Sequence, residues 1–264
     1  MRQNRHKWQP NSRDTSWQGV SDWYKGVVGD KGSYYHQHVV VPNVLRLLGE
    51  HPYSSVLDMG CGQGVFGRYL DEKIVYLGVD LAKDLVDFAK KNDITKNHDY
   101  LVSDITKEML LPKKDYDAAV CLLALQNVEK PDMLIQNTAR YLKKNGRFVI
   151  VINHPCFRIP RQSAWGIDEE QNVQYRRVSS YLSVMKIPVA AHPSQGKKSP
   201  VTWSMHFSLS QISGDLFRAG FVIEKIEEWI SDKKSMGGAA ARENKSRQET
   251  PLFMGLVVRK ISVK

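Results

Sequence analysis

One short run constrains the fold of this 264-residue chain more than any other: Val56-Leu57-Asp58-Met59-Gly60-Cys61-Gly62-Gln63-Gly64. The run begins with apolar residues typical of a buried strand, passes an acidic residue and ends in three glycines at alternate positions. Glycines at this spacing let a strand turn sharply while a ligand lies against bare backbone. The run therefore predicts a nucleotide-binding α/β fold.

The residues around the glycines indicate which nucleotide would bind. The dinucleotide-binding pattern reads G-x-G-x-x-G, and its pyrophosphate lies at a helix N-terminus. Here Val65 stands where the third glycine would be, and Asp58 precedes Gly60 by two residues. A carboxylate so close would repel a pyrophosphate, whereas it would attract a ligand that carries an ammonium and a sulfonium. S-adenosylmethionine is such a ligand.

A second strand-like run, Val75 to Asp80, ends in an acidic residue 18 positions after Gly62. An acid at that place can accept hydrogen bonds from both hydroxyls of a ribose. Through this run and the glycine loop the chain resembles the class I S-adenosylmethionine-dependent methyltransferases, and the resemblance implies S-adenosylmethionine as the cofactor. The alternative is a generic tight turn followed by a strand-end aspartate.

The resemblance assigns the cofactor site to residues at the ends of successive strands: Asp58, Gly60, Cys61, Gly62, Asp80, Leu81, Ser103, Asp104, Ile105, Cys121 and Leu122, with His38 from the segment that enters the domain. The first four would face the methionine moiety, and the next two the ribose and one side of the adenine. The three residues at the end of the third strand would hold the adenine. The last two would lie close to the sulfonium, although a buried core position suits Cys121 equally well.

The rest of the chain alternates between strand-like and helix-like runs, as a doubly wound fold should. The predicted strands are 55–59, 75–80, 100–103, 117–123, 147–153, 221–229 and 251–260, and the predicted helices are 65–72, 85–92, 130–144 with Asn145-Gly146 as its cap, and 208–219. This order predicts an α/β, Rossmann-like, seven-stranded, mostly parallel sheet with an antiparallel last strand. We expect one domain over residues 1–264, made of an N-terminal arm and helix (1–48), a cofactor-binding core (54–154), a substrate lid inserted after the fifth strand (155–206) and a C-terminal helix and strands (207–264).

The segment after the fourth strand indicates the class of acceptor. Enzymes that methylate amines of nucleic-acid bases usually carry an Asn/Asp-Pro-Pro-aromatic run there, and Leu122 to Val128 lacks it. The segment instead resembles that of small-molecule methyltransferases. A long insertion rich in aromatic residues follows His154 and runs to about His206. Its apolar content argues against disorder, so we interpret it as a lid over the acceptor.

Methyl transfer is an in-line displacement, so alignment and desolvation can supply most of the catalysis. A general base is needed only where the acceptor proton must leave first. The candidates for such a base are His154, His206 and Tyr35, with Tyr34, His36 and His38 as further ones in the segment that enters the domain. For each histidine, a hydrogen-bonded or surface ring is the simpler interpretation.

Composition leaves two other functions open. The formal charge of +10 is compatible with RNA or protein as the acceptor, although the basic residues are scattered and the cluster at Asp232 to Arg247 is predicted to be a mobile loop. A nucleotide-binding protein without transferase activity is the other alternative. Three widely spaced cysteines indicate neither a disulfide framework nor a metal site. No apolar run approaches the roughly 20 residues that cross a bilayer, so a cytoplasmic location is expected.

Overall fold

Seven strands form one sheet in the computed structural model, which describes residues 17–191 and 199–261. The sheet order is β10-β11-β5-β4-β1-β2-β3, and the strands are β1 (Ser55–Met59), β2 (Val75–Asp80), β3 (His98–Val102), β4 (Tyr116–Leu122), β5 (Leu142–Asn153), β10 (Phe221–Trp229) and β11 (Phe253–Lys260). Strand β11 runs antiparallel to both of its neighbours, and the other pairs are parallel. The predicted Rossmann-like sheet is therefore confirmed.

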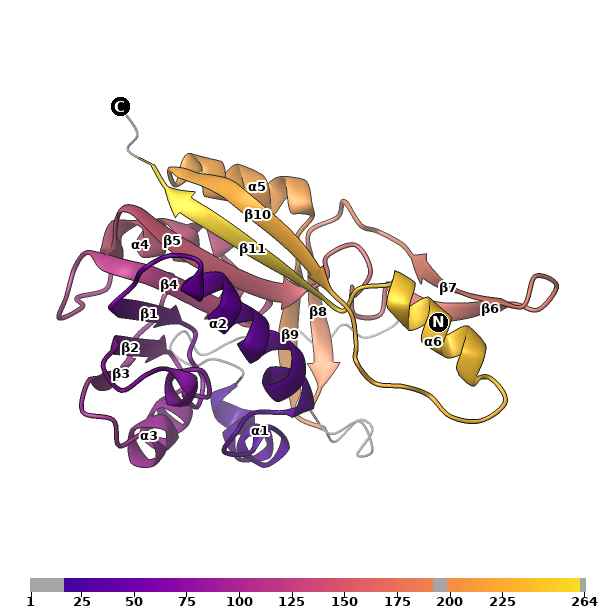
Figure 1. Cartoon of the computed structure of the whole chain (residues 1–264), viewed down its shortest axis with the longest axis horizontal. Coiled ribbons are helices and arrows are strands. Elements are labelled where there is room, and N and C mark those ends of the chain that lie inside the picture. The colour runs from indigo at the N-terminus through magenta and orange to yellow at the C-terminus, as the bar shows by residue number, and fades with distance from the viewer. Residues whose placement is uncertain (1–16, 192–198, 262–264) are drawn as a thin grey trace, which may run out of the picture.

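Helices cover both faces of this sheet (Figure 1). Helices α2 (Val41–Gly49) and α3 (Lys83–Asn92) pack on one face, while α4 (Pro131–Tyr141) and α5 (Leu209–Arg218) pack on the other. Successive residues of a strand point to opposite faces, so Phe148 of β5 enters one core and Val149 the other. Because both faces are buried, the central strands are apolar throughout.

The insertion after β5 forms two hairpins, β6 (Ser163–Asp168) with β7 (Val173–Val178) and β8 (Met185–Ala190) with β9 (Val201–His206). Figure 1 shows the β6–β7 hairpin extending away from the sheet, with α6 (Ala240–Glu249) beside it.

Helix α6 begins at Ala240, so the prediction of a loop from Asp232 to Arg247 is wrong for its second half, whereas residues 232–239 form no helix or strand. The helix is held against β7, because the Ser246 hydroxyl donates to the Gln174 carbonyl (2.9 Å) and Arg242 donates to the Asn172 side chain (3.1 Å). These tertiary contacts involve residues far away in the sequence, which a local pattern does not reveal.

Two helix predictions in the core are also wrong. Residues 65–72 form turns and a short 3₁₀ helix, Gly67–Tyr69, rather than an α-helix. The left-handed backbone of Gly64 (φ +71°) prolongs the glycine loop, and a Cβ on Gly67 would lie 2.7 Å from the Tyr100 hydroxyl. The loop and this close packing leave too few residues for a helix.

Helix α4 ends at Tyr141 rather than at the predicted Asn145-Gly146 cap. The next residue, Leu142, is fully buried and already pairs with Tyr116 of β4. Burial of this leucine in the sheet fixes the helix end.

The N-terminal segment consists of a 3₁₀ turn (Gln18–Val20), α1 (Ser21–Val28) and a π-helical turn (His36–Val40) that continues into α2. Pro42 lacks the N–H that an α-helical bond to the His38 carbonyl would need, which favours the wider turn before it. Within residues 17–191 and 199–261, no helix is both long and apolar enough to cross a membrane.

Candidate active site

The glycine loop lies after β1, at the carboxyl edge of the parallel strands, and its backbone donors are already used within the protein. The Gly60 and Cys61 N–H groups both donate to the Val79 carbonyl (2.8 and 3.1 Å), and the Gly62 N–H donates to Asp80 Oδ2 (2.9 Å). Gly60 and Gly62 have left-handed backbone, with φ of +87° and +54°. A pyrophosphate needs such N–H groups for itself, so the loop does not suit a dinucleotide.

Asp80 ends β2 beside this loop. Its Oδ1 accepts from the Ala82 N–H (2.8 Å), and its Oδ2 accepts from Gly62. Burial raises the pKa of this carboxyl, and the backbone hydrogen bonds from Ala82 and Gly62 oppose that rise. Each carboxylate oxygen can accept a second bond, so the side chain can still bind two hydroxyls. Leu81 follows directly and is half-buried.

Asp58 lies at the centre of the sheet and is only 2 % exposed. Its Oδ2 accepts from the Tyr76 hydroxyl (2.8 Å), while Oδ1 has no hydrogen-bond partner among the described residues. Burial, with a smaller contribution from the charge of Asp80, raises the pKa of Asp58 to about 7 against the lowering effect of Tyr76. A buried carboxylate oxygen without a donor fits the ammonium of S-adenosylmethionine, because a cation would supply the missing partner.

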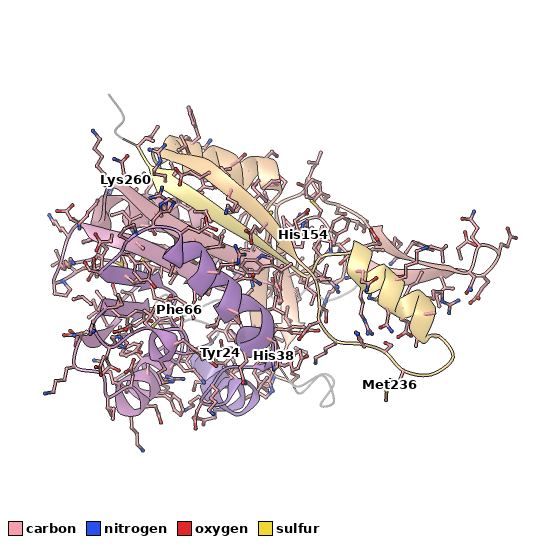
Figure 2. The ribbon with its side chains drawn as sticks, viewed as in Figure 1. Tyr24, His38, Phe66, His154, Met236 and Lys260 are labelled. Carbon is pink, nitrogen blue, oxygen red and sulfur yellow. The ribbon has the colours of Figure 1, made fainter. Side chains whose placement is uncertain are left out.

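Tyr24 of α1, which belongs to the predicted N-terminal arm and is labelled in Figure 2, lies over the glycine loop. A Cβ on Gly62 would be 3.8 Å from the Tyr24 hydroxyl. Burial, then the charges of Asp80, Cys61 and Asp58, raise the pKa of Tyr24. The phenol therefore stays neutral beside the acids at the strand ends.

The arm is fastened across the loop by side chains of the residues that follow it. Gln63 donates to the Gly29 carbonyl (2.6 Å), Arg68 donates to the Asp30 carbonyl (2.6 Å), and the Tyr69 hydroxyl donates to the Lys31 carbonyl (2.8 Å). The carbonyls belong to three consecutive arm residues. These bonds place α1 as a cover over the glycine loop.

The predicted adenine-binding residues follow β3. The Ser103 N–H donates to the Asp80 carbonyl (3.0 Å), which ties this turn to the end of β2. Asp104 accepts from the Thr106 N–H and hydroxyl (3.0 and 2.6 Å) and from Lys107 (3.1 Å). Burial favours a higher pKa, but these bonds lower the pKa of Asp104 overall. Ile105 is buried next to the glycine loop.

The end of β4 contributes a core residue, a half-buried residue and a strained bend. Cys121 is fully buried in the core, which is the structural role that the sequence left open, and Leu122 is half-buried. Leu123 has φ of +56°, uncommon for a residue with a side chain. After the bend, the Ala124 Cβ lies where a side chain on Gly60 would be.

Of the predicted bases, His154 has partners on both ring nitrogens. The Cys156 N–H donates to Nδ1 (3.2 Å), so Nε2 carries the proton of the neutral ring and donates to Glu228 (2.6 Å). Burial lowers the pKa of His154 despite the opposing contribution of Glu228. His154, labelled in Figure 2, is thus held as a link between β5 and β10.

His206 at the end of β9 has a different arrangement. Its Nε2 lies 2.7 Å from the Tyr181 carbonyl. A carbonyl only accepts, so Nε2 is the protonated nitrogen and Nδ1 keeps a free lone pair for accepting a proton. His206 also lines a cavity of about 30 Å³ between the segment after β4, the end of β5 and the insertion that follows β5.

Tyr35 and His38 lie near the segment that follows β10. The Tyr35 hydroxyl is 3.2 Å from that of Ser231, and the His38 ring stacks on Tyr34 (4.3 Å between centroids) and lies 3.8 Å from Asp232. Among the described residues, no hydrogen bond, ion pair or ring contact joins His38 to the glycine loop. The structure brings Asp58, the glycines and Asp80 together, whereas Tyr35 and His38 contact the segment after β10.

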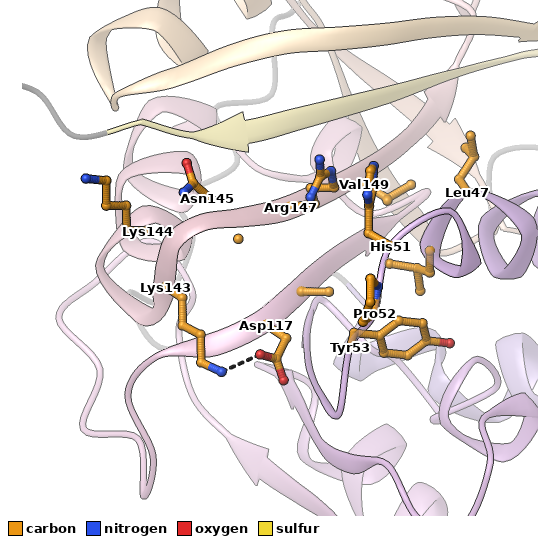
Figure 3. Close-up of a pocket in the computed structure, with 13 residues that line it drawn as sticks. Leu47, His51, Pro52, Tyr53, Asp117, Lys143, Lys144, Asn145, Arg147 and Val149 are labelled. Carbon is orange, nitrogen blue, oxygen red and sulfur yellow. Dashed lines mark hydrogen bonds and ion pairs between the residues drawn. The ribbon is translucent and has the colours of Figure 1, made fainter.

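A larger cavity, of about 130 Å³, lies at the opposite edge of the sheet, where β1 and β4 begin (Figure 3). Asp117 and Lys143 form an ion pair there, and Asp117 also accepts from Ser54. Ligands of such sheets bind at the carboxyl ends of the strands, so this cavity is not part of the candidate site. Within the described ranges, no three His, Cys, Asp or Glu side chains gather as a metal would require.

Comparison with known proteins agrees with this geometry. A sequence profile of the methyltransferase domain family matches residues 57–150. A ubiquinone biosynthesis O-methyltransferase of Coxiella burnetii is 31 % identical over 113 residues, which are 41 % of this chain and 46 % of that protein. The chain thus matches about half the length of that curated relative, and the family profile lies within the predicted cofactor-binding core.

Two solved structures share the fold over most of the chain. An S-adenosylmethionine-dependent methyltransferase from Mesorhizobium loti is 25 % identical with a TM-score of 0.63, covering 82 % of this chain and 96 % of that one. A putative one from Listeria monocytogenes is 22 % identical with a TM-score of 0.64, covering 84 % and 100 %. Fold, glycine loop and strand-end acids define a class I Rossmann-like methyltransferase domain. Residues 57–150 thus carry a methyltransferase domain, and the chain as a whole has the fold of S-adenosylmethionine-dependent methyltransferases.

Proposed function

We propose that this chain transfers a methyl group from S-adenosylmethionine to a small organic acceptor by in-line displacement. The observation that carries the proposal is the buried Oδ1 of Asp58, which has no hydrogen-bond donor among the described residues. Asp58 lies on β1, directly before a loop whose own N–H groups are already bonded. When bound there, the cofactor supplies an electrophilic methyl on a cationic sulfur.

Each part of the domain has a role in this proposal. Asp58 and residues 60–62 orient the methionine moiety, Asp80 and Leu81 the ribose and one side of the adenine, and residues 103–105 the adenine. Leu122 lies toward the sulfonium. Within the described residues, the arm and first helix (17–48) cover the cofactor held by the core (54–154), the lid (155–191 and 199–206) covers the acceptor, and the C-terminal part (207–261) completes the sheet. The remaining residues of the predicted arm, lid and C-terminal part lie outside the described ranges.

If the acceptor must lose a proton, His206 is the base that we favour. Its Nδ1 is the unprotonated nitrogen, and it borders the cavity under the lid. His154 has both nitrogens bonded, and Tyr35 contacts Ser231, so these two residues position the lid and the arm. Such a base contributes typically 10²- to 10⁴-fold to the rate.

The acceptor class rests on the segment after β4 and on similarity to an enzyme named for ubiquinone biosynthesis. Leu122 to Val128 lacks the Asn/Asp-Pro-Pro-aromatic run of enzymes that methylate nucleic-acid bases. Both observations support a small molecule over RNA.

Calorimetry with the full chain tests the cofactor assignment. We expect S-adenosylmethionine to bind and NAD not to bind. Asp80→Ala should weaken binding by roughly 1.5–3 kcal/mol for each lost hydrogen bond to the charged acceptor. Asp87→Ala, which removes an exposed acid from α3 paired with Lys83, is the matched control and should leave the affinity unchanged. Binding of NAD alone, or an unchanged affinity of Asp80→Ala, would refute the assignment.

A further inference from the structure

Two arginines of the lid make cation–π contacts with the same tryptophan ring. The Cζ atoms of Arg158, which follows β5, and Arg176, on β7, lie 5.7 and 5.2 Å from the centre of the Trp165 ring on β6. Arg176 is fixed further, since its Nε donates to the Phe157 carbonyl (2.8 Å) and its Nη2 to the Ser163 hydroxyl (2.9 Å). Cation–π contacts of this kind hold a guanidinium plane in place without neutralising its charge.

Neither guanidinium is neutralised within the described part of the chain. No Asp or Glu there forms an ion pair with Arg158 or Arg176, and the buried Nε of Arg158 has no acceptor among those residues. Burial, followed by the charge of Arg176, lowers the pKa of Arg158 to about 10, so the side chain remains cationic at neutral pH. A half-buried cation without a partner is costly unless a ligand supplies the negative charge.

Arg158 faces the place where the acceptor would bind. It lines the 30 Å³ cavity together with Gln126, Asn153 and His206. The Oε1 of Gln126 is also buried without a partner among the described residues. The cavity therefore offers an anion-binding donor and a neutral polar group beside the proposed base.

We propose that Arg158, supported by Arg176, binds a carboxylate of the small acceptor. The inference rests on the proposed function and adds the chemical class of the substrate. A planar guanidinium matches a carboxylate with two parallel hydrogen bonds. The remaining lining is largely apolar, including Leu125, Met205 and Phe207, and burying a dianionic phosphate there would cost more than burying a singly charged carboxylate.

The carboxylate is an anchor rather than the methylated group. Two guanidiniums would withdraw electron density from its oxygens and make them poor nucleophiles. The cavity volume of about 30 Å³ is far below the roughly 300–1,000 Å³ of a typical small-molecule site. The acceptor therefore enters only when the lid hairpins move outward.

Calorimetry with matched probes tests the inference. Benzoate and 4-hydroxybenzoate are titrated into the full chain, with and without S-adenosylhomocysteine, beside benzamide and 4-hydroxybenzamide. We expect the wild-type chain to bind at least one acid roughly tenfold more tightly than its amide. Arg158→Gln should lose this preference, and Arg158→Lys should keep only part of it because a lysine cannot form the two parallel bonds.

Arg177→Gln is the matched control, because Arg177 is the exposed neighbour of Arg176 on the same strand. It should behave as the wild-type chain. Equal binding of acids and amides by the wild-type chain, or an unchanged preference in Arg158→Gln, would overturn the inference. Binding of S-adenosylhomocysteine is measured separately in each variant. Its absence from the wild-type chain would refute the proposed function instead, so the two failures are distinguishable.

Discussion

Ionisation of Asp58 should make the cofactor-free protein less stable as the pH rises. The unfolded chain loses this proton near pH 3.8, whereas burial keeps it on the folded protein until about pH 7. Between these values the folded state binds one more proton than the unfolded state. The free energy of unfolding therefore falls by about 1.4 kcal/mol for each pH unit in this window.

The total loss of unfolding free energy follows from the difference between the folded and unfolded pKa values of Asp58. The difference of about three pH units corresponds to roughly 4 kcal/mol at pH 8, as an upper estimate for a buried group. The stabilisation that protonated Asp58 gives the folded state is fully present below about pH 4 and is lost as the pH rises through about 7. Asp58→Asn removes the ionisation and can still accept the hydrogen bond from Tyr76. It should match the wild-type chain near pH 4 and be more stable by a few kcal/mol at pH 8.

Urea unfolding of both proteins at several pH values measures this difference, and other titrating groups cancel in the subtraction. The cofactor reverses the preference, because its ammonium favours the ionised carboxylate. Wild-type affinity for S-adenosylmethionine should therefore rise roughly tenfold between pH 6 and pH 8, whereas Asp58→Asn should bind weakly at both values. A stability difference that does not change with pH would refute the reasoning.

Two further substitutions test the loop and its cover. Gly60→Ala should lower the free energy of unfolding by about 2–5 kcal/mol, because its Cβ would lie 2.5 Å from that of Ala124 at a φ of +87°. In Gly62→Ala the nearest atom to the new Cβ is 3.8 Å away, so only about 1–2 kcal/mol of backbone strain is expected. If urea unfolding showed equal losses of stability in the two variants, the predicted clash of Gly60→Ala with Ala124 would be contradicted. Tyr24→Ala should speed cofactor release about tenfold in stopped-flow measurements, because the ring covers the loop. An unchanged release rate would show that the arm is no cover.

The cofactor half of the molecule was predictable because its signals are local. A strand that ends in Asp58 and a glycine loop, followed by a strand that ends in Asp80, fixes two strand ends in one stretch of sequence. Parallel strands bring such ends to one edge, so spacing alone gives the geometry. The helix predicted at 65–72 failed because Gly67 packs against Tyr76 and Tyr100, a contact between distant residues.

The region over the proposed acceptor site was less predictable, because its contacts also join residues that are distant in the sequence. The sequence indicated an aromatic lid, but not that Arg158 and Arg176 would meet at Trp165. Those residues come from three separate elements, and no repeating pattern connects them. Likewise, His154 stood out by its place after β5, although its partner Glu228 lies 74 residues later and occupies the nitrogen that a base would need.

Charge also differs between the two sides of the proposed site. In the proposed binding mode, the buried acids Asp58 and Asp80 lie by the ammonium and the ribose of the cofactor, while Arg158 and Arg176 belong to the lid over the acceptor. An anionic acceptor would be repelled by the acids and attracted by the arginines. The cationic end of the cofactor would be attracted by the acids and repelled by the arginines. The same fields would draw the two substrates into line with each other. In this proposal, the orientation that methyl transfer requires comes from acids on the cofactor side and arginines on the acceptor side, with little shape selection by the small cavity that Arg158 lines.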